Sequence, residues 1–255
     1  MTRIPLYCVP LLLLVITLDT SPALANWPLN GAPVTLGSNN EGELHAASDG
    51  AGGALVTWID IRNGQNYDIY VQRMDGWGRT TWTQYGVAAC VATGDQNVPK
   101  VAGDGTGGAI VTWMDSRGAN SDIYVQRIDA SGTALWTANG VAVCTAAGNQ
   151  SEPQVASDGA GGAVVTWSDS RSGASDIYAQ RLNALGAPQW TADGFAVCVA
   201  TGNQTEPRLA PTGFGGGFIT WTDGRGANLD IYAMWLDQYA VPYWATDGSP
   251  VCTAT

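Results

Sequence analysis

The sequence predicts an all-β protein: a β-propeller-type array of four-stranded antiparallel blades, with about 54 residues per repeat, four repeats and one extra strand. Three observations predict this fold class. The pattern Trp-x-Asp-x-Arg recurs at near-constant spacing, starting at Trp58, Trp113, Trp167 and Trp221. A second tryptophan keeps the same period, at Trp27, Trp82, Trp136, Trp190 and Trp244. Outside the N-terminal segment, no window shows apolar residues at helical spacing.

The third repeat shows the four strands expected in every unit: Gln154–Ala156, Ala163–Trp167, Asp176–Leu182 and Trp190–Val199. These segments are rich in Val, Ile, Thr, Tyr and Trp and are bounded by Gly, Asp, Asn and Pro. Both faces of Ala163–Trp167 are largely apolar, so the sheet needs cover on both sides. Blades stacked face to face provide that cover. A linear β-solenoid is the alternative, although its coils are usually shorter, at about 20 to 30 residues.

The N-terminus predicts a signal peptide over residues 1–25, because Arg3 precedes the apolar run Leu11–Leu18 and small residues lead up to Ala25. The chain is therefore expected to be secreted, periplasmic or attached to the cell surface after cleavage near Ala25, without membrane insertion. The remaining residues, 26–255, are expected to form the repeat domain, divided as 27–81, 82–135, 136–189, 190–243 and a partial unit 244–255.

The repeat domain begins and ends with the fourth strand of a unit, at Trp27–Thr35 and Trp244–Thr253. One such strand exceeds four complete blades. It could pair with the other end of the chain or with a second chain, or the chain could be a piece of a longer array. A homodimer that completes a larger, eight-bladed ring is a hypothesis on this basis.

Charge and cysteine spacing exclude several classes of partner. The net charge of −11 and the pI near 4.2 leave no cationic face for nucleic acid. Cys8 leaves with the signal peptide, and the other cysteines are 54 residues apart at one repeat position: Cys90, Cys144, Cys198 and Cys252. Packed sheets lie about 10 Å apart, whereas a disulfide needs Cα atoms within about 7 Å. We therefore expect four unpaired, buried thiols.

The turn sequences carry a resemblance to a known family. The run Gly162-Ala-Val-Val-Thr-Trp167-Ser-Asp169-Ser-Arg171 resembles blades of the sialidase-like, Asp-box type of β-propeller found in exported bacterial proteins, and the resemblance spans residues 27–255. The turns Asp75–Trp82 and Asp129–Trp136 match the Asp box with one extra residue on each side of the glycine. In the third copy Asn183 replaces the aspartate. The resemblance implies the blade and not an activity.

The repeated aspartates and arginines after the first tryptophan are the candidate site. One interpretation is a salt-bridged turn that holds the loop; the other is a ring of equivalent rim pockets for a repeated ligand such as a glycan. The candidate binding residues are Asp60, Arg62, Asp115, Arg117, Asp169, Arg171, Asp223 and Arg225. Trp77 lies in a turn, outside the repeat pattern, and is the candidate exposed contact.

Other patterns give no metal, cofactor or catalytic set. Loops such as Asp158–Gly162 hold one carboxylate each and precede no helix, so they read as hairpin turns rather than as calcium or phosphate sites. His45 is the only histidine, and the few glutamates fall near the start of the first strand: Glu41, Glu43, Glu152 and Glu206. Arg and Tyr recur alike in every unit, whereas catalysis needs unlike groups at one point.

These observations predict an exported, non-catalytic binding or scaffold module, and not an enzyme, with a glycan or protein ligand. The alternative is a degenerate or partial sialidase-like glycoside hydrolase. A structural fragment without a ligand is a third possibility. The sequence does not identify the ligand.

Overall fold

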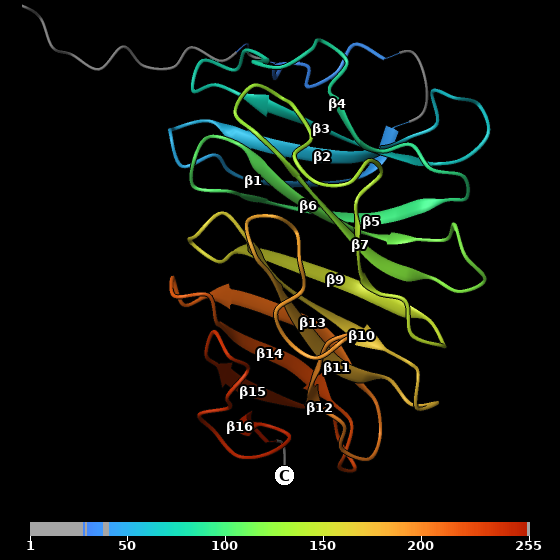
Figure 1. Cartoon of the computed structure of the whole chain (residues 1–255), viewed down its shortest axis with the longest axis vertical. Coiled ribbons are helices and arrows are strands. Elements are labelled where there is room, and N and C mark those ends of the chain that lie inside the picture. Colours follow the sequence, from blue (N-terminus) through green and yellow to red (C-terminus); the bar gives the residue numbers. More distant parts are fainter. Residues whose placement is uncertain (1–27, 29, 38–40, 254–255) are drawn as a thin grey trace, which may run out of the picture.

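The computed structural model describes residues 28, 30–37 and 41–253 and shows four four-stranded antiparallel sheets that follow one another along the chain (Figure 1). The predicted signal peptide and Trp27 lie outside the described residues. Within each sheet the strands keep their chain order, so each repeat forms one blade. The predicted all-β, propeller-type array is therefore confirmed.

The four blades contain strands of matching length. The first consists of β1 (Glu41–Ser48), β2 (Ala54–Asp60), β3 (Asp68–Met74) and β4 (Val87–Cys90). The second consists of β5 (Gln96–Gly103), β6 (Ala109–Asp115), β7 (Asp122–Ile128) and β8 (Val141–Cys144). The third consists of β9 (Gln150–Ser157), β10 (Ala163–Asp169), β11 (Asp176–Leu182) and β12 (Phe195–Cys198). The fourth consists of β13 (Gln204–Pro211), β14 (Gly217–Asp223), β15 (Asp230–Leu236) and β16 (Ser249–Cys252).

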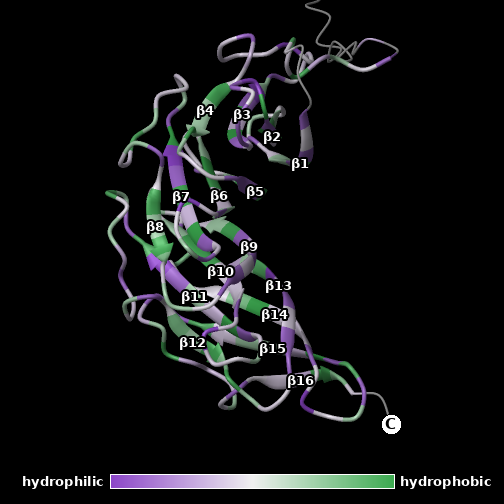
Figure 2. Cartoon of the chain, turned by 90° about the vertical axis from the view of Figure 1, so that its right-hand side faces the viewer, coloured by the Kyte–Doolittle hydropathy of each residue, from purple (hydrophilic) through white to green (hydrophobic). Residues whose placement is uncertain are grey.

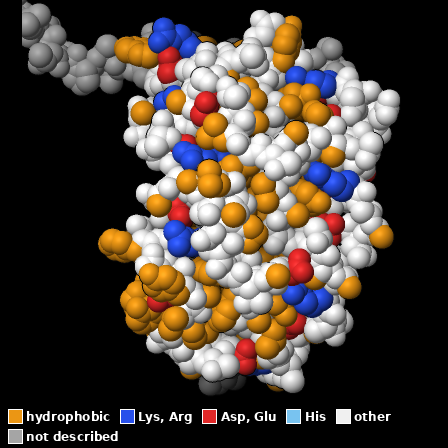
Figure 3. Space-filling model, in the orientation of Figure 1, with side chains coloured by type: hydrophobic (Ala, Val, Ile, Leu, Met, Phe, Trp, Pro, Cys, Tyr) orange, Lys and Arg blue, Asp and Glu red, His pale blue; other side chains and the backbone are white. Residues whose placement is uncertain are grey.

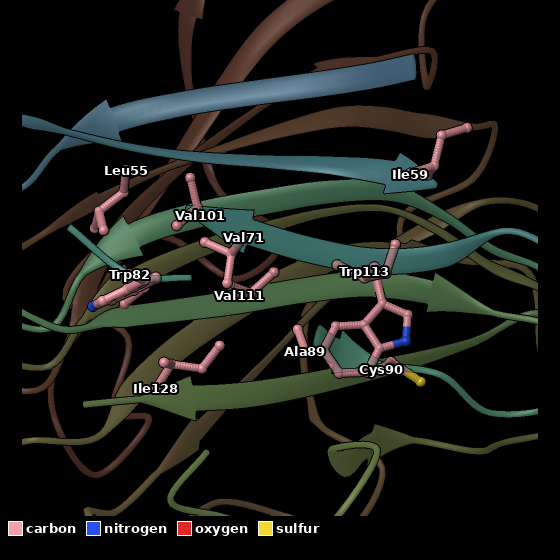
Figure 4. Packing of buried hydrophobic residues seen from close by; sticks show 12 residues of the cluster. Leu55, Ile59, Val71, Trp82, Ala89, Cys90, Val101, Val111, Trp113 and Ile128 are labelled. Atoms are coloured by element: carbon pink, nitrogen blue, oxygen red, sulfur yellow. The ribbon is translucent and has the colours of Figure 1, made fainter. Parts of the chain in front are cut away.

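The hydrophobic core lies between blades rather than within them. Leu55 and Val71 of the first blade pack on Val111 and Trp113 of the second, and the same arrangement recurs between later blades (Figure 4). Every residue of β10 is buried, as a sheet covered on both faces requires. The tryptophans at the Trp-x-Asp-x-Arg positions are buried as predicted, because each lies between two layers.

The second tryptophan of each repeat joins one blade to the next. The indole Nε1 of Trp82 donates to the carbonyl oxygen of Ala130, and Trp136 and Trp190 make the equivalent bonds to Ala184 and Gln238. The cysteines face the following blade in the same way. Cys90, Cys144 and Cys198 are unpaired and buried, as predicted. The prediction of burial is wrong for Cys252, which is exposed because no blade among the described residues covers that face of the fourth.

The expected strand at Trp27–Thr35 is not formed in the described residues of that segment. A fourth strand pairs with the third strand of its own blade, and the described residues of this segment make no such pairing. The segment lies beside the first blade, where Val34 and Thr35 border a small cavity of about 140 Å³ next to Trp58. Trp58 is buried on this side of the first blade.

The four blades form a curved row, and the first strand of each blade lies on the inner side of the curve (Figure 2). The inner strands β1, β5, β9 and β13 are neighbours in that order. They are longer than predicted: β9 begins at Gln150, four residues before the expected start. Side chains from all four repeats therefore meet on one inner surface.

Candidate functional site

One repeat position places four unlike polar side chains on the inner surface. His45, Lys100, Gln154 and Arg208 occupy the same register on β1, β5, β9 and β13, where each pairs with the central threonine of its second strand. The repeat also varies at other positions, such as Gly42, Asn97, Ser151 and Thr205, but this one brings its four side chains together in one cavity.

These side chains line a cavity of about 490 Å³, which we call the axial pocket. Its lining consists of His45, Val98, Lys100, Glu152, Gln154, Glu206 and Arg208. All four inner strands contribute, so the pocket exists only when the blades are assembled. A cavity of this size with several convergent polar groups is the usual form of a small-molecule or cofactor site.

A β-bulge in each inner strand shapes the wall of the pocket. The bulged residues have positive φ angles, which side-chain-bearing residues rarely adopt: Glu43 at 44°, Val98 at 51°, Glu152 at 55° and Glu206 at 55°. Such backbone strain costs about 1 to 3 kcal/mol per residue and is concentrated at functional sites. Because β-branched Val98 adopts it too, the bulge is imposed by the fold and not by the glutamates.

The bulges also link neighbouring blades through glutamate. A carboxylate oxygen of Glu43 accepts the backbone N–H of Val98 at 2.7 Å, and a carboxylate oxygen of Glu152 accepts that of Glu206 at 2.7 Å. The same oxygen of Glu152 accepts the hydroxyl of Ser168 at 2.8 Å, which fixes its position. The carboxylate of Glu206 forms no side-chain hydrogen bond or ion pair to another described residue. The pocket thus has one anchored and one free carboxylate.

Two cations in the pocket lack carboxylate partners among the described residues. The guanidinium of Arg208 donates only to the backbone carbonyls of Glu206 and Pro207. Burial, and after it the charge of Arg208, hold the pKa of Lys100 below its usual range, while Glu43 acts in the opposite direction. The pocket thus holds two cations and two carboxylates, and the cations could bind an anionic group of a ligand.

His45 contributes a neutral imidazole beside these cations. Burial, and after it the charge of Lys100, lower the pKa of His45 below 6.5. Its Nδ1 accepts the backbone N–H of Val101 at 3.2 Å, so in the neutral ring the proton is on Nε2. His45 can therefore donate one hydrogen bond to a ligand without adding a third positive charge.

The residues predicted at the rim form internal networks instead of open pockets. In each blade the aspartate is buried and pairs with the arginine two residues later; the third blade has Asp169 and Arg171 at 2.6 Å. The Nε1 of Trp167 donates to the same carboxylate, and the guanidinium lies 3.9 Å from the ring centre of Tyr178. The other pairs repeat this geometry: Asp60 with Arg62, Asp115 with Arg117, and Asp223 with Arg225.

The arginines also tie this network to the preceding blade. Arg171 Nη2 lies 3.1 Å from the sulfur of Cys144, and Arg117 and Arg225 approach Cys90 and Cys198 in the same way. These contacts support the salt-bridged-turn interpretation. Ligand binding at the rim stays a prediction. Trp77, the other predicted contact, is 47% exposed and lies outside the axial pocket.

The hairpins that could have suggested an ion site are closed by their own aspartates. Asp158 Oδ1 accepts the N–H groups of Ala160 and Gly162, and Gly159 and Gly161 adopt the positive φ that these tight turns need. In the described part of the chain, no group of three or more His, Cys, Asp or Glu side chains is arranged to hold a metal ion. No helix among those residues is long and apolar enough to span a membrane.

Reasoning from sequence missed the axial pocket because its members are about 54 residues apart and come from four different repeats. The available signal was the variation at one repeat position. At the position of His45, Lys100, Gln154 and Arg208, the residue type differs in every copy while the side chain stays polar. Where a repeat array converges on an inner surface, that pattern marks candidate ligand contacts.

Comparison with known proteins identifies structures of similar fold. No protein-family profile matches the chain, and no curated protein matches it in sequence. An endo-arabinase from Bacteroides thetaiotaomicron matches with a TM-score of 0.49 and 14% identity, over 87% of this chain and 84% of that one. A thermostable family-43 glycoside hydrolase matches with a TM-score of 0.46 and 13% identity, over 88% and 77% of the two chains. An α-L-arabinofuranosidase from Fusarium graminearum, solved with an iminosugar inhibitor, matches with a TM-score of 0.47 and 14% identity, over 87% and 71%.

These findings correct two predictions. The similar structures are glycoside hydrolases, so the prediction of a non-catalytic binding or scaffold module is contradicted, as is the prediction that the chain is not an enzyme. The alternative, a glycoside hydrolase, agrees better with them. At these identities the likeness concerns the fold, and any argument about function must come from the residues of the axial pocket.

Proposed function

We propose that the chain is a glycoside hydrolase that binds an acidic glycan in the axial pocket. The observation that carries this proposal is the convergence of two carboxylates, two unpaired cations and a neutral imidazole at one point of an otherwise uniform array. The rim networks repeat in every blade, whereas this set of unlike groups occurs once among the described residues. Asymmetry of that kind is what catalysis requires.

Most glycoside hydrolases use a pair of carboxyl groups, one as acid or base and one as nucleophile or base. Glu206 has the free carboxylate and is assigned the acid–base role. Glu152, held by the Ser168 hydroxyl and the Glu206 N–H, is assigned the second role. Lys100 and Arg208 would hold a carboxylate substituent of the sugar, as in a uronic acid, and His45 Nε2–H would bond a hydroxyl. The pocket volume of about 490 Å³ suits one or two sugar rings.

The test is hydrolysis of a panel of chromogenic glycosides and polysaccharides. It includes arabinosides, because two of the similar structures are an arabinase and an arabinofuranosidase, together with mannosides and with uronic-acid and sialic-acid glycosides. Glu206→Gln is expected to lower kcat by about 10² to 10⁴ with little change in KM, the usual effect of removing a general acid or base. Asp75→Asn, in an exposed turn, is the matched control. Absence of turnover across the panel, or full activity of Glu206→Gln, would overturn the proposal.

Substrate charge has its own test. Lys100→Gln is expected to raise KM for uronic-acid glycosides by about tenfold while leaving KM for neutral glycosides nearly unchanged, because only the former lose an ionic contact. Equal changes for both substrate types would contradict the acidic-glycan assignment.

We also propose that the chain is related to the sialidase-like, Asp-box propellers. Its turns resemble lengthened Asp boxes: Asp129 Oδ1 accepts the N–H groups of Ser131 and Thr133, and Asp75 Oδ1 accepts those of Trp77 and Arg79. Cleavage of sialosides in the panel would support this relationship. Rejection of sialosides alongside cleavage of another class would place the chain elsewhere among glycan hydrolases.

The N-terminal pattern supports export of residues 26–255 as one repeat domain, which we propose for this chain. Sequencing the mature N-terminus after cell fractionation tests it, with Asn26 the expected first residue. A homodimer that completes a larger ring and a protein ligand also stay predictions. Sedimentation at micromolar concentration tests the homodimer, and a monomeric mass would dismiss it.

A further inference from the structure

The fourth blade departs from the repeat on its uncovered side. In the other blades an arginine of the third strand pairs with the aspartate that opens the glycine hairpin; Arg181 and Asp158 lie 2.9 Å apart, and the other pairs are Arg73 with Asp49 and Arg127 with Asp104. In the fourth blade the corresponding residues are Trp235 and Thr212. A salt bridge has been replaced by an indole and a hydroxyl at one blade only.

Aromatic residues accumulate around that replacement. Tyr243 stacks on Trp235 with ring centres 4.0 Å apart and planes 15° apart, and Phe218 lies 5.4 Å from the other side of Trp235. Phe214 and Tyr239 protrude from the two adjacent turns with 83% and 73% of their surface exposed. Figure 3 shows hydrophobic side chains gathered at the lower left, over the sheet β13–β16.

These residues enclose a hollow of about 330 Å³, which we call the aromatic hollow. It is lined by Phe214, Trp235, Tyr239 and Tyr243 together with the polar residues Thr212, Asp237 and Gln238. Asp237 Oδ1 accepts the N–H groups of Tyr239 and Val241, which leaves Oδ2 available to a ligand. Exposed ring faces beside hydrogen-bonding groups suit a molecule with an apolar face and a polar edge.

Neither a bare terminal face nor a docking face for a further blade accounts for this surface. A terminal blade that only meets solvent should have a polar outer face, yet this one has five aromatic residues at positions where the second and third blades have none and the first has only Trp77. A following blade of the same repeat would need the arginine that reaches across: Arg127 Nη1 donates to the carbonyl of Gly161 in the next blade at 2.8 Å, and Arg181 packs against Gly215. Trp235 cannot make that bond. The fourth blade therefore lacks one of the polar contacts between neighbouring blades, although it keeps the second tryptophan at Trp244.

We propose that the aromatic hollow is a second glycan-binding site, at which a sugar ring stacks on Tyr243 or Tyr239 while its hydroxyls bond to Asp237 and Gln238. The hollow lies beyond the far end of β13 from Glu206, so it is separate from the axial pocket. It would hold a remote part of a polysaccharide whose reactive part occupies the axial pocket. The inference rests on the proposed function for its ligand class, and on the aromatic residues for its location.

Residues at the equivalent positions of the other blades can be substituted into the fourth blade. Thr212→Asp combined with Trp235→Arg recreates the salt bridge already present in the other three blades, so the fold should tolerate it. Tyr239→Ser introduces the residue that the second blade has at the equivalent position, Ser131. Phe214→Ala introduces the residue that the third blade has at the equivalent position, Ala160. Both residues are exposed, so neither change removes core packing. Circular dichroism and a thermal melt confirm folding of each variant.

The measurement is retardation in native gels containing arabinan, mannan, xylan or polygalacturonate, with chromogenic glycoside hydrolysis in parallel. The wild-type chain is expected to be retarded by at least one polysaccharide. The aromatic variants are expected to weaken that binding about tenfold while cleaving small glycosides at the wild-type rate. Glu206→Gln is expected to show the reverse pattern. The wild-type chain could be retarded by a polysaccharide, lose that retardation in the aromatic variants, and hydrolyse none of the glycosides. That result would support the second site and refute the proposed hydrolase function.

Unchanged retardation of Thr212→Asp/Trp235→Arg and of Tyr239→Ser would overturn the second site. So would a dimer in sedimentation that these variants convert to a monomer without any change in glycan binding, because the surface would then be a protein interface. A wild-type chain retarded by no polysaccharide in the panel would also count against it.

Discussion

The ion pair of Asp169 and Arg171 should be among the most sensitive contacts of the fold. Asp169 is fully buried and its two oxygens accept bonds from the Arg171 N–H, from the guanidinium at 2.6 and 2.9 Å, and from the indole of Trp167 at 2.9 Å. Asp169→Asn keeps the shape but leaves the guanidinium without its counter-charge. Breaking a buried pair in this way costs about 3 to 5 kcal/mol, and the 22% exposure of the Arg171 side chain places the expected value near 3.

Urea unfolding of purified Asp169→Asn and of the parent chain measures this loss, provided the slope m is unchanged. The control is Asp75→Asn, whose partner Arg79 is 73% exposed and whose solvent-screened ion pair should contribute little to stability. For a domain of this size, 3 kcal/mol corresponds to a fall in Tm of about 6 to 12 °C. A loss for Asp169→Asn no larger than that for Asp75→Asn would refute the assignment of the rim network as a structural tie between blades.

The effect should also depend on pH. Burial alone would raise the pKa of Asp169, but the hydrogen bonds from Arg171 and Trp167 hold it below 3.8. A carboxyl group whose pKa is lower in the folded state stabilises the fold above the unfolded value, and this contribution is lost as pH falls through the folded pKa. The difference between the parent chain and Asp169→Asn should therefore be full at pH 7 and shrink below pH 3.8.

Three further predictions concern the thiols, the histidine and the bulge. In the folded mature chain only Cys252 should react promptly with a thiol reagent at pH 8, because burial raises the pKa of Cys90, Cys144 and Cys198 to about 12. If Cys252→Ser still reacts promptly, the prediction is wrong. Because burial and Lys100 lower the pKa of His45, the parent chain should lose stability relative to His45→Gln as pH falls below 6.5, and parallel Tm curves from pH 7.5 to 5 would argue against it. Val98→Glu should let residue 98 accept a hydrogen bond from the N–H of Glu152, as Glu43 and Glu152 do from the next blade. The variant should be about 1 kcal/mol more stable in urea unfolding and should bind acidic glycans more weakly. A loss of stability would show that the bulge excludes a longer side chain.

The blade architecture could be predicted from sequence because every unit needs the same contacts. Strand β11 occupies the predicted Asp176–Leu182, since its ends are marked by a loop and a turn that recur in each copy. The start of β9 was not predicted, because Glu152 and Pro153 read as a polar link. Their backbone forms a bulge, which lets a strand contain a proline and a glutamate with positive φ.

Predictions failed where a neighbour was missing or where members of a site came from different repeats. The period of 54 residues assigned Cys252 the environment of Cys198, yet burial depends on a following blade and not on the cysteine. The segment 27–35 has the residues of a fourth strand, but its described part pairs with no strand of the described sheets. The axial pocket was overlooked because His45, Lys100 and Arg208 acquire a common function only when the blades curve around them.

Two of the places where this chain departs from its repeat have different physical origins. At the axis the strand register and the strained bulge recur in all four blades, so the variation among His45, Lys100, Gln154 and Arg208 changes chemistry while the local backbone pattern is kept. At the fourth blade the variation removes a salt bridge that still holds the other three, and it exposes aromatic rings that water solvates poorly. Neither change strengthens the contacts between blades. Both sets of residues line cavities large enough to accept a sugar, which is why both proposals place a ligand there.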